Sequence, residues 1–129
     1  MQIHQSAEDY LETILMLTQQ MGHVRSIDVV NELGFTKASV SIAMKKLREN
    51  GYIAVDGEGN LTLLEPGREI AERIYSRHRL LTHFFMQLGV DEKTAAEDAC
   101  KAEHILSEQT LEKIRESALR TDAAAQEDE

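Results

Sequence analysis

The chain has 129 residues and a formal net charge of −9, with 14 Lys and Arg residues against 23 Asp and Glu residues. Its length suits one compact unit, or a small domain with a helical extension, and its apolar fraction of 42% suits a globular core. No stretch approaches the ~20 apolar residues of a membrane span, and the single cysteine fits a reducing cytosol. We therefore expect a cytoplasmic protein, neither membrane-bound nor secreted.

Polar caps and apolar spacing predict three helices in the first fifty residues. Apolar residues at i, i+3 and i+4 mark the first helix over 7–20, with Ser6 as its N-cap. The second helix is predicted over 27–33, with Ser26 as its N-cap. A third helix begins after the N-cap Thr36 and ends at a glycine.

The pattern then changes from helical to alternating. Two short β-type runs, over 52–55 and 61–64, flank a turn of Gly, Asn and acidic residues and predict a hairpin. Two helices, a glycine turn, a basic third helix and a hairpin are typical of a winged helix-turn-helix, which places one helix in the DNA major groove. Three-helix cores that bind nothing have a similar order, so the order alone does not decide the function.

Three further helices are predicted in the second half of the chain. Pro66 suits the first turn of a long helix. Asp91 and Ser107 are N-caps for two more helices, which we expect to end near Leu106 and Leu119. The fold class is therefore mainly α.

The third predicted helix has one apolar face and one face of short and basic side chains. Apolar residues at i, i+3, i+4 and i+7 from Val40 are expected in the core. On the other face, short side chains allow close approach to base edges, Ile42 suits a thymine methyl, and the lysines suit phosphates. An ordinary solvated helix face would carry the same lysines, but the turn and hairpin around it favour DNA contact. The predicted DNA-contacting residues are Thr36, Lys37, Ala38, Ser39, Ser41, Ile42, Lys45 and Lys46.

Carboxylate, imidazole and thiolate side chains, the ligand types of first-row divalent metals, occur in a suggestive pattern. One cysteine, one glutamate and one histidine lie at i, i+3 and i+4 of a single predicted helix, so they share a face. The first helix carries two acids three residues apart, and the long helix carries a histidine. Each residue alone suits an ordinary role as a solvated acid, core histidine or buried cysteine. The candidate metal ligands are Asp9, Glu12, His78, Cys100, Glu103 and His104.

Four segments carry a family resemblance: 7–17, 36–53, 61–85 and 88–114, of which the last is the most specific. In this order they resemble the diphtheria-toxin-repressor-like family of metal-dependent transcriptional regulators, and in particular its short manganese-transport-regulator type. The resemblance implies a winged-helix DNA-binding domain, a helical dimerisation domain and an ion bound between them. It also implies that the liganded homodimer represses genes for metal uptake, and that all six candidate residues are metal ligands.

Several positions depart from the family pattern. Manganese-type members usually have Glu where this chain has Cys100, and iron-type members have Met where this chain has Asp9. The second site of iron-type members falls on Thr82 and Ala96 and is not expected to form. We also expect no counterpart of the SH3-like domain of longer members. The expected activating ion is Mn²⁺ or Fe²⁺, and Co²⁺ or Zn²⁺ are candidates in vitro.

The resemblance also implies how the chain is divided and what it binds. We expect a winged helix-turn-helix over 1–65, and a helical metal-binding and dimerisation domain over 66–120 with a long linking helix at 66–88. A disordered acidic tail is expected over 121–129. The expected partners are a palindromic double-stranded operator and a second copy of the chain, with no membrane and no organic substrate.

Two other functions fit parts of the sequence. A Cys/His/Glu group also occurs in hydrolases and metalloenzymes. We find no residue that would orient a Cys–His pair, no glycine-rich phosphate loop and no H-E-x-x-H motif, so we do not expect an enzyme. The second alternative is a metal-independent winged-helix regulator that senses a small organic ligand. A DNA mobility shift with and without a chelator separates the three functions.

Overall fold

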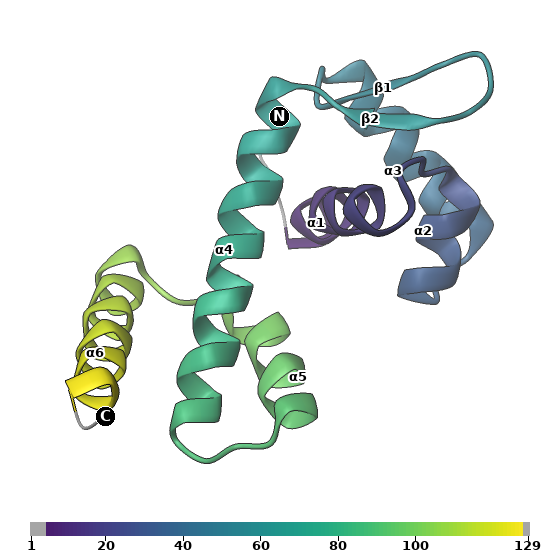
Figure 1. Cartoon of the computed structure of the whole chain (residues 1–129). Coiled ribbons are helices and arrows are strands. Elements are labelled where there is room, and N and C mark those ends of the chain that lie inside the picture. Colours follow the sequence, from purple (N-terminus) through teal and green to yellow (C-terminus); the bar gives the residue numbers. More distant parts are fainter. Residues whose placement is uncertain (1–4, 128–129) are drawn as a thin grey trace. The chain divides into compact units, whose positions relative to one another are not determined.

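The chain folds as six helices and one two-stranded hairpin in the part that the structure, a computed structural model, describes (Figure 1). Residues 5–127 are described, with the backbone alone for 122–127. This confirms the mainly α fold class. The elements are α1 (Gln5–Met21), α2 (Ser26–Leu33), α3 (Lys37–Glu49), β1 (Ile53–Val55), β2 (Leu61–Leu63), α4 (Glu65–Gln87), α5 (Glu92–Ala102) and α6 (Glu108–Glu127).

Two compact units divide the chain, Met1–Arg73 and Ile74–Glu129. The first contains α1 to β2 and the start of α4, and the second contains the rest of α4 with α5 and α6. Among the described helices, none is both long and apolar enough to cross a membrane.

Of the three N-caps predicted in the first unit, the structure confirms one. Thr36 is the N-cap of α3, and its side-chain oxygen accepts a hydrogen bond from Ser39 N at 3.1 Å, as predicted. Ser6 and Ser26 are not caps, because both lie inside their helices. Arg25 precedes α2 instead, and its backbone N–H donates to Asp28 Oδ2 at 2.9 Å. The Asp28 carboxylate thus accepts from the residue that precedes the helix, which is the contact that the N3 side chain makes in a capping box.

The wing is the antiparallel hairpin of β1 and β2, in which Ile53 pairs with Leu63 and Val55 with Leu61. Asp56 shapes its turn, since its carboxylate accepts hydrogen bonds from the backbone of Glu58 and Asn60 at 2.8 and 2.9 Å. These bonds, led by that from Asn60, lower the pKa of Asp56. The segment after α1 pairs with the start of β2, because Leu61 N donates to Val24 O at 2.7 Å.

One continuous apolar cluster forms the core of the first unit. Leu11 and Ile14 of α1, Leu47 of α3 and Ile53 of β1 are all fully buried within it. Gly67, in the first turn of α4, lies against the wing: a Cβ atom there would stand 2.2 Å from Tyr52 O. The hairpin and α4 therefore approach so closely that no side chain fits between them.

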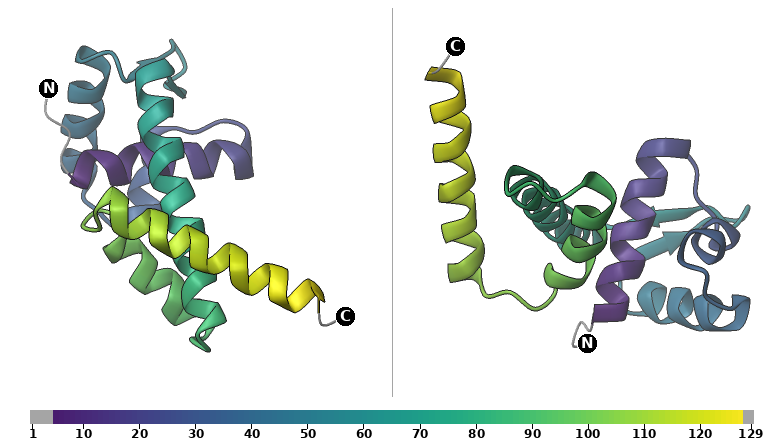
Figure 2. Two further views of the ribbon diagram at one scale, coloured as in Figure 1. Left: turned by 90° about the vertical axis from the view of Figure 1, so that its left-hand side faces the viewer. Right: turned by 90° about the horizontal axis from the view of Figure 1, so that it is seen from below.

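The second unit has a smaller apolar cluster, with Leu81, Ala99 and Leu111 at its centre. Asp91 and Ser107 cap α5 and α6 as predicted, accepting from Thr94 N at 3.1 Å and Thr110 N at 3.2 Å. A short connection leads from α5 into α6 (Figure 2).

Two helix ends in this unit differ from the prediction. The helix α5 ends at Ala102 rather than near Leu106, because the chain forms a turn that leads to the next N-cap, Ser107. The helix α6 continues to Glu127 rather than ending near Leu119, and so it includes residues 121–127, for which the sequence predicts a disordered tail. That stretch contains an alanine run, and alanine is the strongest helix former. Residues 128–129 lie outside the described residues.

Candidate metal ligands and DNA-contacting surface

A buried carboxylate lies at the centre of the candidate ligands in the second unit. Glu103 is completely buried. Its Oε2 lies 3.0 Å from His78 Nδ1, and its Oε1 lies 3.4 Å from His104 Nε2. The His104 side chain is 1% exposed and that of His78 is 21% exposed. Three candidate ligands from α4 and from the turn after α5 therefore converge away from solvent.

This arrangement fits a divalent cation. Burying a carboxylate is unfavourable unless hydrogen bonds, a charge or a metal satisfies it. Within residues 5–127, Glu103 Oε1 accepts no hydrogen bond. Imidazole nitrogens with carboxylate oxygen are suitable ligands for Mn²⁺, Fe²⁺, Co²⁺ and Zn²⁺.

The end of α5 at Ala102 determines where Glu103 and His104 lie in the structure. Glu103 is the C-cap of α5, with helical backbone angles of φ −60° and ψ −22°, and its N–H donates to Ala99 O. His104 therefore lies in the following turn, not on the helix, so the prediction that all three ligands share one helical face is wrong in this respect. Cys100 is on α5 itself and is exposed.

The first unit holds the predicted acidic pair. Asp9 and Glu12 are both on α1, three residues apart, and Asp9 is half-buried while Glu12 is buried. Between them in sequence, Tyr10 packs into the core. Burial, and to a smaller extent the nearby charge of Asp9, raises the pKa of Tyr10. The two acids thus lie on a helix that also contributes buried side chains to the core of the first unit.

The helix α3 has the two faces that the sequence predicts. Val40, Met44 and Leu47 are buried. Ile42 is the most exposed large apolar residue of this helix, at 58%. A hollow of about 380 Å³ next to it is lined by side chains of α3, including Lys46, and of α1, including Tyr10. All eight predicted DNA-contacting residues are exposed, namely Thr36, Lys37, Ala38, Ser39, Ser41, Ile42, Lys45 and Lys46.

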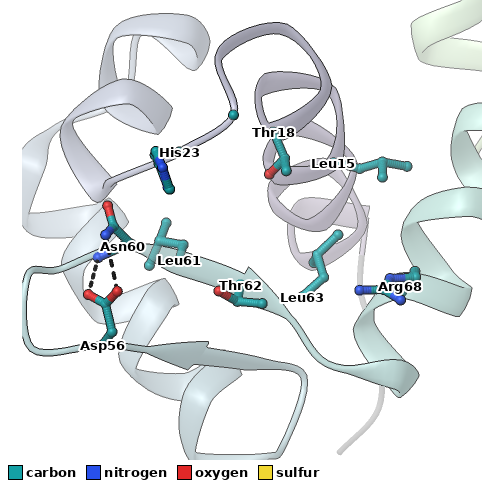
Figure 3. A pocket seen from close by; sticks show the side chains of 10 residues that line it. Leu15, Thr18, His23, Asp56, Asn60, Leu61, Thr62, Leu63 and Arg68 are labelled. Atoms are coloured by element: carbon teal, nitrogen blue, oxygen red, sulfur yellow. Dashed lines mark hydrogen bonds between the residues drawn. The ribbon is translucent and has the colours of Figure 1, made fainter.

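Another hollow, of about 400 Å³, lies between α1, the wing and the start of α4 (Figure 3). Leu15, Leu61 and Leu63 form its apolar wall. Asp56 at its rim is already bonded to Asn60, as the dashed lines in Figure 3 show. None of the six candidate metal ligands lines this hollow.

Family comparisons identify both units. Residues 2–61 match the profile of the iron dependent repressor N-terminal DNA binding domain, and residues 64–121 match the iron dependent repressor metal binding and dimerisation domain. The chain belongs to the iron-dependent-repressor family. This confirms the family of metal-dependent transcriptional regulators that the sequence resembles.

Individual relatives agree with this family. A transcriptional regulator of the helix-turn-helix type from Methanocaldococcus jannaschii is 36% identical over 113 residues, which are 86% of this chain and 90% of the relative. The regulator MntR of Bacillus subtilis is 34% identical over 109 residues, which are 84% of this chain and 77% of MntR.

Solved structures of the family share the fold. A manganese-dependent transcriptional repressor in complex with manganese has a TM-score of 0.77 at 28% identity, and the match covers 87% of this chain and 52% of that chain. The manganese regulator SloR has a TM-score of 0.74 at 25% identity, and the match covers 85% of this chain and 52% of SloR. This chain therefore spans about half the length of these family members.

One residue beside the candidate ligands was not found from the sequence. Arg77, directly before His78 on α4, donates from Nη1 to Glu103 O at 3.2 Å. An arginine within a charged helix gives no local signal, because its partner lies 26 residues away in the chain.

Proposed function

We propose that this protein is a transcriptional repressor of metal-uptake genes, activated by Mn²⁺, Fe²⁺ or both. The observation that carries the proposal is the buried Glu103 carboxylate between two imidazoles, His78 and His104, inside the region that matches the family's metal-binding domain. The exposed face of α3 lies inside the region that matches its DNA-binding domain.

We infer that residues of both units hold the ion. A bound divalent cation supplies positive charge that offsets the mutual repulsion of several carboxylates. Glu103 lies between two histidines and is bonded to one of them, His78, whereas the acids of α1 belong to the DNA-binding unit. Sharing ligands in this way would link α1, and with it the placement of α3, to metal concentration. The proposed ligands are Asp9, Glu12, His78, Cys100, Glu103 and His104.

On the DNA side, α3 is proposed to enter the major groove. Lys45 and Lys46 are exposed next to Ile42, so the lysines suit phosphates while the isoleucine suits a thymine methyl. A homodimer binding a palindromic operator would place two such helices on successive grooves. Because the proposed target is chromosomal DNA, we also propose a cytoplasmic location. We propose that the protein is not an enzyme.

The activating metal depends on whether Cys100 is a ligand. A thiolate favours Fe²⁺, Co²⁺ or Zn²⁺, whereas an oxygen-rich set favours Mn²⁺. Affinity alone follows the Irving–Williams order, so activation of DNA binding is the quantity to compare between metals. Replacing Cys100 by Glu is expected to shift activation towards Mn²⁺ relative to Fe²⁺, and an unchanged ratio would remove Cys100 from the proposed ligands.

Mobility shift of DNA from upstream of a metal-transporter gene tests the proposal. We expect a shift with Mn²⁺, and with Fe²⁺ under anaerobic conditions, that chelator abolishes. The Glu103→Gln variant should lose the metal-dependent shift, whereas the control Glu112→Gln, at a half-exposed site on α6, should retain it. A shift that ignores metal would favour the regulator of a small organic ligand, and a normal metal-dependent shift in Glu103→Gln would contradict the site.

A further inference from the structure

Arg77 contacts two segments of the second unit, the turn that begins at Glu103 and the start of α6. Its side chain is 15% exposed. Nη1 donates to the backbone carbonyl of Glu103 at 3.2 Å, and Nη2 forms an ion pair with the carboxylate of Glu108, the first residue of α6. One guanidinium on α4 therefore bridges the end of α5 and the start of α6.

Glu103 is consequently held at both ends by consecutive residues of α4. Arg77 binds its backbone carbonyl, and His78 lies 3.0 Å from its carboxylate. The last carbonyl groups of a helix have no partner within that helix, and an arginine can satisfy such a group while a second nitrogen binds elsewhere. Fixing the backbone of Glu103 limits the directions in which its buried carboxylate can point.

We propose that Arg77 is a positioning residue for the metal site and that, through Glu108, it ties the start of α6 to the same turn. The part that concerns metal rests on the proposed function. The role of Arg77 in holding the turn does not depend on the proposed function, because its contacts with Glu103 and Glu108 are made without a metal ion. Partners that orient metal ligands in this way typically change metal affinity by 10–100-fold when they are removed.

A simple charge effect would act in the opposite direction. Arg77 is a cation next to a proposed cation site, so removing its charge alone would strengthen metal binding. Loss of positioning would weaken it. The sign of the change in metal affinity therefore distinguishes a charge effect of Arg77 from a positioning effect. A double variant that removes one positive and one negative charge leaves the net local charge unchanged and so isolates the positioning effect.

The test compares Arg77→Met, Arg77→Lys and the double variant Arg77→Met/Glu108→Gln, which loses one charge of each sign. Arg115→Met is the control, because it removes a similar ion pair, with Glu112, that does not involve Glu103. Metal titration with Mn²⁺ gives the affinity, the visible spectrum of the Co²⁺ form reports ligand geometry, and amide hydrogen exchange of residues 103–108 is measured in the metal-free protein.

We expect Arg77→Met and the double variant to bind Mn²⁺ about 10-fold or more weakly, with altered Co²⁺ bands. Arg77→Lys should recover much of the affinity, and Arg115→Met should match the wild type. Unchanged or tighter Mn²⁺ binding with an unchanged Co²⁺ spectrum in Arg77→Met would overturn the proposed role.

The exchange measurement separates this inference from the proposed function. If Arg77 holds the turn, exchange at 103–108 is faster in metal-free Arg77→Met than in the wild type. If exchange is unchanged, Arg77 does not hold the turn. A wild-type protein that binds no metal would contradict the proposed function, whereas the exchange result would still decide what Arg77 does. Should Arg77→Met fail to fold, Glu108→Gln alone is expected to give smaller changes of the same sign, since Glu108 is 80% exposed.

Discussion

The first unit buries one continuous set of apolar side chains that runs from α1 to α4, whereas the apolar cluster of the second unit is built around Leu81, Ala99 and Leu111. Each unit buries a carboxylate, Glu12 in the first and Glu103 in the second, and each leaves large apolar residues exposed, such as Ile42 in the first and Leu88 in the second. Apolar burial is the main favourable term in folding. The first unit therefore has the larger apolar core, and we expect the second unit to gain relatively more stability from a bound ion and from a second copy of the chain.

The largest expected effect comes from opening the core of the first unit. Leu47 of α3 is 1% exposed, so Leu47→Ala leaves a cavity and should lower the free energy of unfolding by about 2–5 kcal/mol. Urea unfolding followed by circular dichroism measures this loss. Ile42→Ala on the opposite, exposed face is the matched control and should stay within about 0.5 kcal/mol of the wild type. Equal losses in both would mean that α3 is not packed as described.

Removal of the metal should lower the stability of the second unit more than that of the first. A ligand present at 100 times its dissociation constant stabilises the folded state by about 2.7 kcal/mol. We expect Mn²⁺ to slow amide exchange mainly in residues 74–121, around Glu103, and chelator to reverse this. Slowing confined to the core of the first unit would contradict the contrast between the units.

Gly67→Ala should destabilise the junction of the wing with α4. A Cβ atom there would meet Tyr52 O, a backbone atom that cannot rotate away and that also accepts a hydrogen bond from Leu64 N. Overpacking of this kind costs about 1–3 kcal/mol, partly offset by the better helix propensity of alanine. Gly57→Ala in the wing turn is the control, because nothing lies within 4 Å of its added Cβ. Thermal unfolding of the two variants should therefore differ, and equal midpoints would show that the wing can move away from α4.

The smallest effect concerns acid stability of the second unit. The hydrogen bonds from the backbone and hydroxyl of Thr94 lower the pKa of Asp91 below its ordinary 3.8. As pH falls, Asp91 is therefore protonated in the unfolded chain at a higher pH than in the folded chain. The stabilisation of the folded state by ionised Asp91 is present above pH 3.8 and is lost as pH falls through the folded pKa. The Asp91→Asn variant keeps a capping oxygen but has no charge at this position. Between pH 5 and pH 3, we expect the protection of the α5 amides from exchange to change less in this variant than in the wild type. An identical pH dependence would contradict the cap.

Local rules predicted much of the fold and less of the site. The hairpin, the Thr36 cap and the face of α3 follow from neighbouring residues, and the structure confirms them. The sequence gives no signal for the requirement for glycine at position 67, because the constraint comes from the backbone of Tyr52, on the other side of the wing.

The candidate ligands show the same division. Side-chain type, helical spacing and the family resemblance predicted His78, Glu103 and His104 as ligands, and the second unit brings these three together. The end of α5 at Ala102 and the contact from Arg77 could not be predicted, because both depend on how the next turn folds against α4. Whether Cys100 is a ligand stays a prediction.

The pairing of Val24 with Leu61 also affects how the protein avoids aggregation. A strand at the edge of a sheet presents free N–H and C=O groups that can pair with a strand from another chain, and a two-stranded hairpin on its own is only marginally stable. Here the bond from Leu61 N to Val24 O, together with the bridge between Arg25 and Asn60, occupies the start of β2. A strand from another molecule could add at that end only by first displacing the segment that joins α1 to α2.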